Sequence, residues 1–308
     1  MLEVYQKTLS KKVSFKGVGL HSGVSSTINL LPAKEDQGIV FKRVDLKKNN
    51  LIKANYSNVS SARLCTTLAN SNGIKVSTVE HLLAALYIVG VDNLLIEINN
   101  EEVPIMDGSS KDFLEVLGKT NLVDQIKKRK YLEISNKIRL IDGERKISIE
   151  PNESSLEVSF QLNYRNKIIG KQKNKVDFQN DNLTEVSNSR TFCLYEDIEK
   201  IKKFGLAKGG SLENAVVVHG DKVLNDGGLR NEKEFVNHKI LDLAGDFLLS
   251  GYRILGKVKC YQGGHELTNL FLKKIFSSSF DFKIKELKDY KILKKSYLKE
   301  TEKIAVNA

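Results

Sequence analysis

The 308-residue sequence predicts an α+β protein built from two domains. A chain of this length exceeds the usual size of one hydrophobic core, so two domains of roughly 130–150 residues are expected. Each half runs from short strand-like segments to longer helical ones, an order typical of the α+β class rather than of a parallel sheet. The basic run Lys127–Lys130 is the best boundary between the halves. We therefore expect domains at residues 1–126 and 131–280, and a basic extension at residues 281–308.

Composition narrows the class of protein. Apolar residues make up 41% of the chain and charged residues 28%, which is ordinary for a soluble globular protein. Cys65, Cys193 and Cys260 are widely spaced and show neither a disulfide framework nor a C-x-x-C motif, which favours a reducing compartment. The N-terminus does not resemble a signal peptide, and the apolar stretch Leu82–Val91 is far shorter than the ~20 residues that span a bilayer. A cytoplasmic protein is expected.

The formal net charge of +11 is concentrated toward the C-terminus. The residues from Phe271 onward contain ten lysines against five acidic residues. Nucleic-acid binding would need a recognised motif or basic residues interleaved with exposed aromatic ones, and we find neither, so no nucleic-acid partner is expected. A basic surface could instead attract a phosphate-bearing substrate or an anionic lipid surface.

The first half is predicted to contain several strands and one strong helix. Strands are expected at Lys12–Phe15, Ser25–Leu30, Gly38–Val44 and Asn93–Ile98. The helix covers STVEHLLAALYIVGVDN, with Ser77 as N-cap, Glu80 completing a capping box and Gly90 as C-cap. The turn Pro104–Ser109 then leads into a second helix from about Lys111.

The second half repeats the order of strands followed by helices. Strands are expected at Tyr131–Leu140, Lys146–Ile149 and Leu156–Leu162. Helices are expected at Tyr195–Phe204, at Glu234–Leu249 and within Leu267–Ile275. No convincing internal sequence repeat accompanies this similarity, so the order alone only hints at a duplicated fold.

The segment FVNHKILDLAGDF carries the clearest local signal for chemistry. His238 and Asp242 are four residues apart, so on a helix they project from the same face, close enough to bind one ion. Asp246 follows one turn later on that face. The H-x-x-x-D spacing is a weak motif, however, and a helix with a charged, solvent-facing stripe has the same pattern. Spacing alone leaves both interpretations open.

A second polar pair, Glu80 and His81, lies at the start of the predicted apolar helix. The plain structural interpretation is a capping Glu80 and a half-buried His81. Because Leu82–Ala85 make this helix apolar on nearly all sides, the pair fits a cleft better than a free face. Two histidines and one aspartate with an open fourth position are typical of catalytic zinc, and a glutamate beside a ligand can act as general base.

Three histidines remain. Two glycines precede His265 and would let it approach another group from a mobile or tightly turned loop; an ordinary loop residue and a third metal ligand are the alternatives. His219 precedes a Gly-Asp pair in a predicted hairpin turn and is interpreted as structural. His21 lies in the glycine-rich GVGLHSG, which suits a loop near a ligand without defining a role.

Several longer segments occur together in an order shared with one known family. They are STVEHLLAAL, IMDGSS, SRTF, LAKGGSLENAVVV, LNDGGLRNEKEFVNHKILDLAGD and GGH. In these segments the chain resembles the bacterial UDP-3-O-acyl-N-acetylglucosamine deacetylases, which catalyse the committed step of lipid A synthesis. The resemblance extends from about Gly17 to Leu272, most of the chain.

This resemblance implies a role for each candidate residue. The family's zinc ligands match His81, His238 and Asp242, its general base matches Glu80, and its general acid matches His265. Thr191 matches the hydroxyl donor to the oxyanion and Lys239 a substrate-contacting lysine. Asp246 matches the carboxylate that orients the catalytic histidine. One catalytic Zn²⁺ is implied, with Fe²⁺ as the alternative metal in cells.

The resemblance also implies an architecture and a passage for a fatty acyl chain. The family fold is a pair of similar α+β domains whose helices lie between two sheets, and each domain carries an insert. The second insert, expected around Lys202–Val218, would line the acyl passage. Suitable small or apolar residues there are Phe204, Leu206, Ala207, Gly210, Leu212, Ala215 and Val217. Phe192 is a further expected substrate contact, and an amphipathic helix packed on the core would have much the same composition.

The implied reaction is zinc-dependent hydrolysis of the N-acetyl group of UDP-3-O-acyl-N-acetylglucosamine, giving the free amine and acetate. A zinc amidohydrolase acting on another N-acyl sugar or on a peptide is the alternative. The substrate carries an acyl chain, so transient contact with the inner-membrane surface, aided by the Lys-rich tail, is a further expectation. A monomer is expected.

Overall fold

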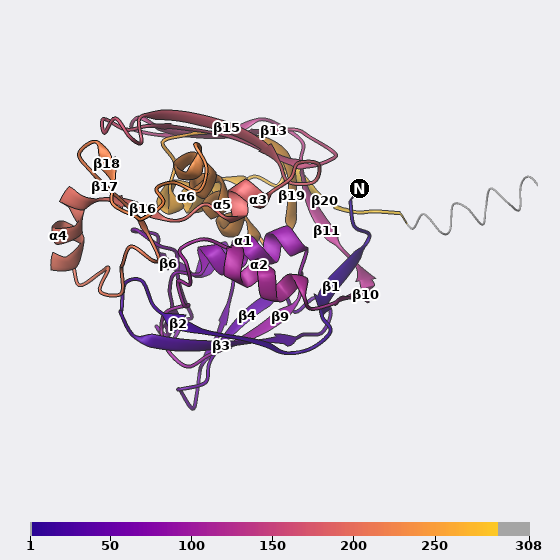
Figure 1. The fold of residues 1–308 in the computed structure, drawn as a ribbon. Coiled ribbons are helices and arrows are strands. Elements are labelled where there is room, and N and C mark those ends of the chain that lie inside the picture. Colours follow the sequence, from indigo (N-terminus) through magenta and orange to yellow (C-terminus); the bar gives the residue numbers. More distant parts are fainter. Residues whose placement is uncertain (1, 289–308) are drawn as a thin grey trace, which may run out of the picture.

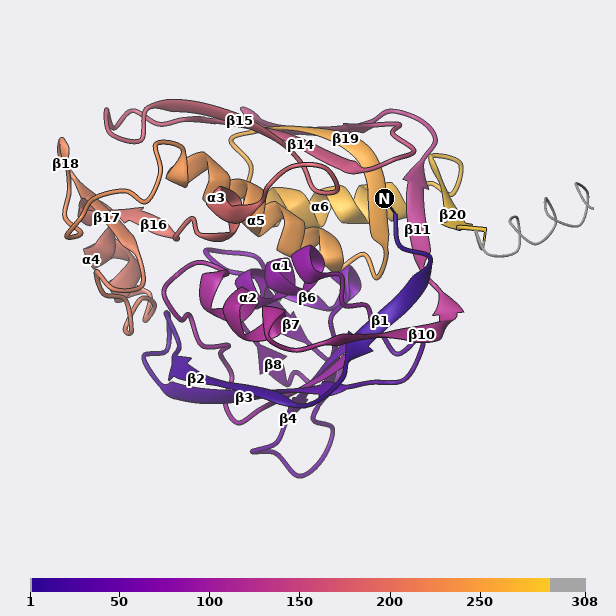
Figure 2. The same ribbon diagram turned by 45° about the vertical axis from the view of Figure 1, so that its right-hand side comes forward.

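In the computed structural model, which describes residues 2–288, two β-sheets enclose a layer of helices (Figures 1 and 2). The lower sheet of Figure 1 comes from the first half of the chain and the upper sheet from the second half. The central helices of the two halves, α1 and α5, pack against each other between the sheets. The predicted α+β class and the sandwich arrangement are confirmed.

The sheet of the first half has five strands in the order β2-β3-β9-β4-β5. These are β2 (Val13–Val18), β3 (Ser25–Pro32), β4 (Ile39–Arg43), β5 (Leu51–Lys53) and β9 (Leu94–Ile98). β4 and β9 are parallel, and the other neighbours are antiparallel. Side chains of β3 alternate between buried and more accessible positions, as expected when one sheet face packs on helices. The four strands predicted from sequence are therefore confirmed.

Two helices and a small separate sheet complete the first half. The helices are α1 (Glu80–Val89) and α2 (Lys111–Gly118). The insert is a three-stranded sheet, preceded by the short 3₁₀ helix η1: η1 (Tyr56–Asn58), β6 (Val59–Ser61), β7 (Thr67–Ala69) and β8 (Lys75–Val76). The predicted second helix from Lys111 is confirmed.

The predicted capping box at the start of α1 is wrong. Helix α1 begins at Glu80, later than expected, because Thr78 has a positive φ of 56° and turns the chain there. Ser77 instead lies in an extended segment, where its hydroxyl donates to the carbonyl of Glu101 at 3.3 Å. Gly90, with φ of 87°, is the left-handed C-cap as predicted.

The sheet of the second half has seven strands, with the path β12-β13-β19-β11-β20 and β14 joining β19 to β15. Its strands are β11 (Lys130–Ile134), β12 (Ile138–Asp142), β13 (Arg145–Glu150), β14 (Leu156–Asn163), β15 (Lys171–Asp177), β19 (Arg253–Tyr261) and β20 (Phe282–Glu286). The single strand predicted at Tyr131–Leu140 is divided into β11 and β12. The other two predicted strands correspond to β13 and β14.

The described part of the second half contains the three predicted helices, and in addition one short helix and three insert strands that were not predicted. They are α3 (Thr184–Ser187), α5 (Glu234–Leu248) and α6 (His265–Phe276), with β16 (Phe192–Leu194), α4 (Tyr195–Lys203), β17 (Val216–His219) and β18 (Lys222–Val223) in the insert. Figure 1 shows the insert projecting at one end of the sandwich. Its three strands form a sheet separate from the two large ones.

The junction between the halves is structured. β1 (Tyr5–Leu9) pairs with β10 (Leu122–Lys128), and β11 starts two residues after β10 ends. Arg129 between them is buried and donates to Asp92 at 2.7 Å. The basic run Lys127–Lys130 therefore belongs mostly to strands.

The predicted basic extension begins as part of the second sheet. β20 pairs antiparallel with β11, and Lys283 and Lys285 form ion pairs with the buried Glu133 at 2.7 and 2.6 Å. Residues 289–308, the rest of the extension, lie outside the described residues. Among residues 2–288, no helix is both long and apolar enough to cross a membrane.

Helix α5 is enclosed by the two sheets. Every residue of this 15-residue helix is buried except Lys239. The alternative of a charged, solvent-facing stripe at His238, Asp242 and Asp246 is therefore wrong. Two buried carboxylates on an enclosed helix need partners to offset the cost of their desolvation.

Gly245 of α5 permits the close approach of α1. A Cβ at this position would overlap the carbonyl oxygen of Glu80. We expect Gly245→Ala to lower the free energy of unfolding by about 1–3 kcal/mol, because the two packed helices must move apart. Gly118→Ala, where a Cβ meets no atom within 4 Å, is the matched control and should not be destabilising. Chemical denaturation of both variants checks this, and equal stability would contradict it.

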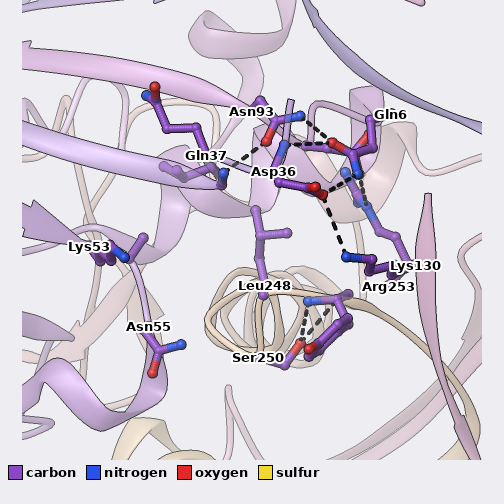
Figure 3. Close-up of a pocket in the computed structure, with 16 residues that line it drawn as sticks. Gln6, Asp36, Gln37, Lys53, Asn55, Asn93, Lys130, Leu248, Ser250 and Arg253 are labelled. Carbon is purple, nitrogen blue, oxygen red and sulfur yellow. Dashed lines mark hydrogen bonds and ion pairs between the residues drawn. The ribbon is translucent and has the colours of Figure 1, made fainter. Parts of the chain in front are cut away.

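A polar cavity of about 450 Å³ lies where the two halves meet, near the C-terminal end of α5 (Figure 3). Its polar side chains already bond one another, as when Gln6 donates to Asp36 at 2.8 Å and Asn93 donates to Gln6 at 2.8 Å. None of the predicted site residues lines it. These hydrogen bonds lie within the first half, whereas the ion pair between Lys130 and Asp36 at 3.6 Å joins this wall to the second half.

Candidate metal centre and active site

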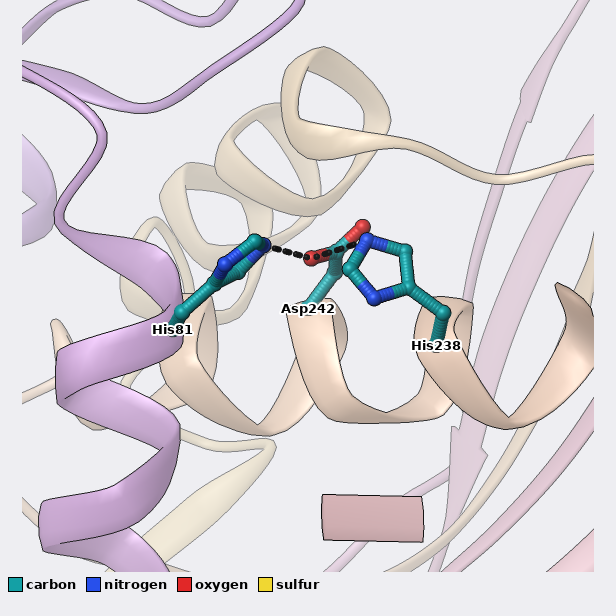
Figure 4. A group of neighbouring side chains, drawn as sticks. All are labelled: His81, His238 and Asp242. Carbon is teal, nitrogen blue, oxygen red and sulfur yellow. Dashed lines mark ion pairs between the residues drawn. The ribbon is translucent and has the colours of Figure 1, made fainter. Parts of the chain in front are cut away.

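The crossing of α1 and α5 brings three predicted metal ligands together (Figure 4). α1 supplies His81, and α5 supplies His238 and Asp242 from successive turns. One ligand atom from each lies within 4.8 Å of the others. Nε2 of either histidine is 3.4 Å from Asp242 Oδ1. The predicted set is therefore assembled in a buried place.

An unsatisfied oxygen in this group fits a bound cation. Asp242 Oδ1, which faces Nε2 of both histidines, is buried without a hydrogen-bond partner in the described part of the chain. Nδ1 of His238 lies 3.1 Å from the carbonyl of Ser189, so a proton there leaves Nε2 free to face the group. Two imidazoles and one carboxylate with room for another ligand form a donor set suited to a catalytic divalent metal.

The protonation states of His238 and Asp242 also favour binding of a cation. Burial lowers the pKa of His238 to about 3, so its imidazole is neutral and able to donate an electron pair. Burial opposes ionisation of Asp242, but His238 and Lys239 outweigh it and hold the pKa of this carboxyl well below its usual range. His238 therefore presents a neutral nitrogen to the group, and Asp242 an ionised oxygen.

Glu80 lies beside the metal-binding group. Its Oε2 accepts a hydrogen bond from the backbone N–H of Thr66 at 3.0 Å, and its Oε1 is 3.6 Å from Nε2 of His265. Burial raises the pKa of this carboxyl. The side chain is thus fixed by the first insert rather than by the predicted cap.

His265 is oriented by a carboxylate. Its Nδ1 lies 2.8 Å from Asp246 Oδ2, and the Thr66 hydroxyl donates to Asp246 Oδ1 at 2.7 Å. Burial alone would lower the pKa of His265, but Asp246 and Glu80 outweigh it and raise the pKa to about 10. His265 is therefore a cation near neutral pH. It is the first residue of α6, so the expected mobile loop is wrong, although a tight turn does precede it.

Thr66 is a site residue that the sequence analysis missed. It bonds both Glu80 and Asp246, and so connects the predicted general base with the carboxylate that orients His265. Its local sequence, LCTT, contains no motif that distinguishes it from the other threonines of the chain. Only the folded arrangement reveals this contact.

Lys239 has a structural partner in addition to its predicted role. Its Nζ donates to Asp242 Oδ2 at 2.8 Å and lies 5.5 Å from the centre of the Phe192 ring. Burial would lower the pKa of Lys239, but Asp242 outweighs it and raises the pKa. The lysine cation therefore holds the Asp242 carboxylate in position, while part of the lysine side chain stays accessible.

An apolar cavity of about 400 Å³ adjoins the metal-binding group. Its lining includes Leu20, His21, Leu64, Thr191, Phe192, Ile198, Ala207, Gly210, Leu212, Ala215 and Val217. The Phe192 ring joins the two regions, since its centre lies 6.2 Å from that of His238. Five of the seven residues suggested for the passage line this cavity. Leu206 does not, and Phe204 is 63% exposed beneath the Arg63 guanidinium.

The alternative of one amphipathic helix over Lys202–Val218 is wrong. Helix α4 ends at Lys203, and residues 204–215 contain no helix. They run instead as turns along the cavity.

The remaining histidines occupy the positions expected. His21 lines the cavity, and its Nδ1 accepts a hydrogen bond from the backbone N–H of Ala207 at 3.4 Å. Burial lowers the pKa of His21, which favours the neutral ring. His219 lies in the β17–β18 hairpin, where its ring packs on Tyr195 at 4.6 Å, in agreement with a structural role.

The site thus combines a metal-binding group, a buried carboxylate and a histidine paired with an aspartate, all beside an apolar cavity. This combination is typical of the class of metal-dependent hydrolases that act on amides or esters.

Comparison with known proteins defines the family. Residues 6–277 match the LpxC family, described as UDP-3-O-acyl N-acetylglycosamine deacetylase. The chain belongs to this family.

Curated relatives agree over most of their length. A UDP-3-O-acyl-N-acetylglucosamine deacetylase of Syntrophotalea carbinolica is 42% identical over 277 residues, covering 90% of this chain and 89% of the relative. Proteins of the same name from Geotalea uraniireducens and Saccharophagus degradans are 41% and 40% identical. The match with the Geotalea protein covers 92% of this chain and 92% of the relative. The match with the Saccharophagus protein covers 96% of this chain and 98% of the relative.

Proposed function

We propose that this protein removes the acetyl group from the amide nitrogen of UDP-3-O-acyl-N-acetylglucosamine in lipid A biosynthesis. The observation that carries the proposal is the position of the metal-binding group beside an apolar cavity formed by the second insert. An acyl chain on the sugar would occupy that cavity while the acetamide reaches the histidines. The names of the relatives agree with this assignment.

His81, His238 and Asp242 would hold the catalytic metal, for which the proposal is one zinc ion. A zinc ion bound there would lower the pKa of water to about 7 and polarise the acetyl carbonyl. Elemental analysis of the purified protein decides between zinc and ferrous iron, because both metals accept this donor set.

The chain's own residues would carry the protons. Glu80 takes a proton from water as the oxygen attacks the acetyl carbon, and its raised pKa suits a base that must later release it. The Thr191 hydroxyl donates to the oxygen that becomes negative, a contribution of about 3 kcal/mol for such a donor. His265, held protonated by Asp246, donates to the leaving nitrogen as the C–N bond breaks. Acetate and the free amine are the products.

Two proton carriers predict a bell-shaped dependence of kcat/KM on pH. Asp246 raises the pKa of His265, so the acid stays protonated through neutral pH and activity falls only when pH rises past that pKa. In Asp246→Asn the alkaline limb should move to lower pH by about one to three units, because the carboxylate no longer favours the imidazolium. The acidic limb, assigned to Glu80, should move less. If the alkaline limb does not move in this variant, the group whose deprotonation causes that limb is not His265.

The substrate assignment is tested by measuring acetate release. The nucleotide-linked acylated sugar should be turned over far faster than simple N-acetyl sugars or N-acetylated peptides. Faster turnover of a simple N-acetyl substrate would instead favour the alternative amidohydrolase. Metal analysis of the same preparation should give one zinc per chain.

We further propose a cytoplasmic monomer that contacts the inner-membrane surface transiently through its Lys-rich tail. The test truncates the chain after Leu287, which keeps β20 and its ion pairs with Glu133 intact. The truncated protein should sediment less with anionic vesicles than the full chain does. Equal sedimentation would exclude the tail as the contact.

A further inference from the structure

We propose that Glu102 is a positioning residue that fixes one wall of the apolar cavity relative to the metal-binding group, and that it thereby favours substrates with a long acyl chain. This inference rests on the proposed function. Glu102 touches neither the predicted metal ligands nor the cavity, and acts through the loop of residues 19–23 and the turn before α1.

The Glu102 carboxylate is buried and receives three hydrogen bonds. The side chain is 2% exposed. Oε1 accepts from the backbone N–H of His21 and from the Thr78 hydroxyl, both at 2.8 Å, and Oε2 accepts from the backbone N–H of Ser22 at 2.7 Å. Hydrogen bonds to an ionised acceptor are stronger than neutral ones, and burial of the carboxylate requires them. Glu102 therefore binds two separate segments of the chain at once, one through backbone N–H groups and the other through the Thr78 hydroxyl.

The first of these segments forms a wall of the cavity. Leu20 and His21 line the cavity, and their carbonyls accept from the N–H groups of Gly209 and Lys208 at 3.0 and 3.2 Å. Lys208 and Gly209 belong to the second insert, whose neighbouring Ala207 and Gly210 also line the cavity. The loop held by Glu102 in turn holds the insert in place.

The fit of this loop leaves little freedom. A Cβ at Gly19 would overlap the Glu102 carboxylate and the Ser22 hydroxyl oxygen. The backbone at residue 19 therefore comes close to the carboxylate only because the residue is glycine. A change in the carboxylate should therefore directly alter the position of the loop.

The second segment leads to the metal-binding group. Thr78, with its positive φ, comes three residues before His81 and forms the turn into α1. The neighbouring backbone supports the same turn, because Ser77 N–H donates to the Glu101 carbonyl at 2.8 Å and Val103 N–H donates to the Ser77 carbonyl at 3.1 Å. One carboxylate thus ties the entry to α1 to the cavity wall.

The two oxygens of Glu102 allow these links to be separated by Glu102→Gln. The glutamine oxygen can replace Oε1 and keep the bonds from Thr78 and His21. Its NH₂ group then faces the N–H of Ser22, and two donors cannot bond. We expect the loop to loosen while the turn before His81 stays in place.

The expected result is a change in acyl preference. In Glu102→Gln, KM for the long-chain nucleotide substrate should rise about tenfold, the equivalent of one lost charge-assisted hydrogen bond. For an analogue with a short acyl chain, kcat/KM should stay within about twofold, because such a chain does not depend on the cavity wall. Bound zinc should be unchanged. Amide hydrogen exchange should become faster in residues 19–23 and 207–210 but not in α1.

Glu101→Gln is the matched control, since this neighbouring side chain is 66% exposed and should alter none of these quantities. A fall in kcat for both substrates without a change in KM, or a loss of zinc, would show a merely structural role and overturn the inference. Unchanged kinetics and exchange would also overturn it. If the wild-type protein releases acetate from neither substrate, the proposed function fails, whereas the exchange experiment still decides whether Glu102 holds the loop.

Discussion

Replacing Glu80 with glutamine should lower kcat for acetate release by about 10²–10⁴-fold while the protein keeps its metal. The glutamine oxygen can still accept from the Thr66 N–H, so the side chain keeps its position and loses only its ability to take a proton. Loss of the charge should also lower the pKa of His265, because Glu80 is one of the groups that raise it.

Glu115→Gln provides the control for this variant. Glu115 belongs to α2, and its side chain is 56% exposed, so neutralising it should change neither kcat nor metal content. Turnover is measured by acetate release, and metal by elemental analysis of the same sample. If Glu80→Gln loses metal in proportion to its activity, Glu80 is a ligand and its assignment as base is wrong.

Replacing Asp242 with alanine should remove metal and activity together. Changes to residues behind a metal ligand already cost about 10–100-fold in affinity, so loss of a ligand should cost at least about 100-fold. The change also removes the acceptor of the Lys239 ammonium and leaves that cation among two histidines without its counter-ion. Dialysis against a fixed low concentration of free zinc, followed by elemental analysis, measures the effect.

Asp124→Ala is the corresponding control, because this side chain on β10 is 67% exposed. It should keep full metal occupancy and activity. Full occupancy in Asp242→Ala at the same free zinc concentration would remove Asp242 from the set of ligands. Retention of metal with loss of activity would instead point to a role in positioning Lys239.

The sequence predicts local spacing well and long-range contacts poorly. The four-residue interval between His238 and Asp242 places them on one helical face, and the structure confirms this. Their burial could not be deduced from the interval, because the same pattern fits a surface helix. The family resemblance supplied His81 as the third member, and the crossing of α1 and α5 explains how it reaches the other two.

The errors and omissions have a common physical cause. Ser77 has the right identity and spacing for a helix cap, yet the positive φ of Thr78 turns the chain and Ser77 bonds elsewhere. Thr66 bonds Asp246 across 180 residues of sequence, and Glu102 bonds His21 across 81. Such contacts depend on how the two sheets and their inserts pack, which local patterns do not specify.

The supply of metal ligands from both halves of the chain has a consequence for assembly. His81 belongs to the first half, whereas His238 and Asp242 belong to the second. A bound ion would therefore act as a cross-link between two folding units, and its binding free energy would add to the stability of their association. Tight binding of the ion would require correctly associated halves, since neither half alone can offer the full set of ligands. Metal supply and the lifetime of the folded chain would then be linked.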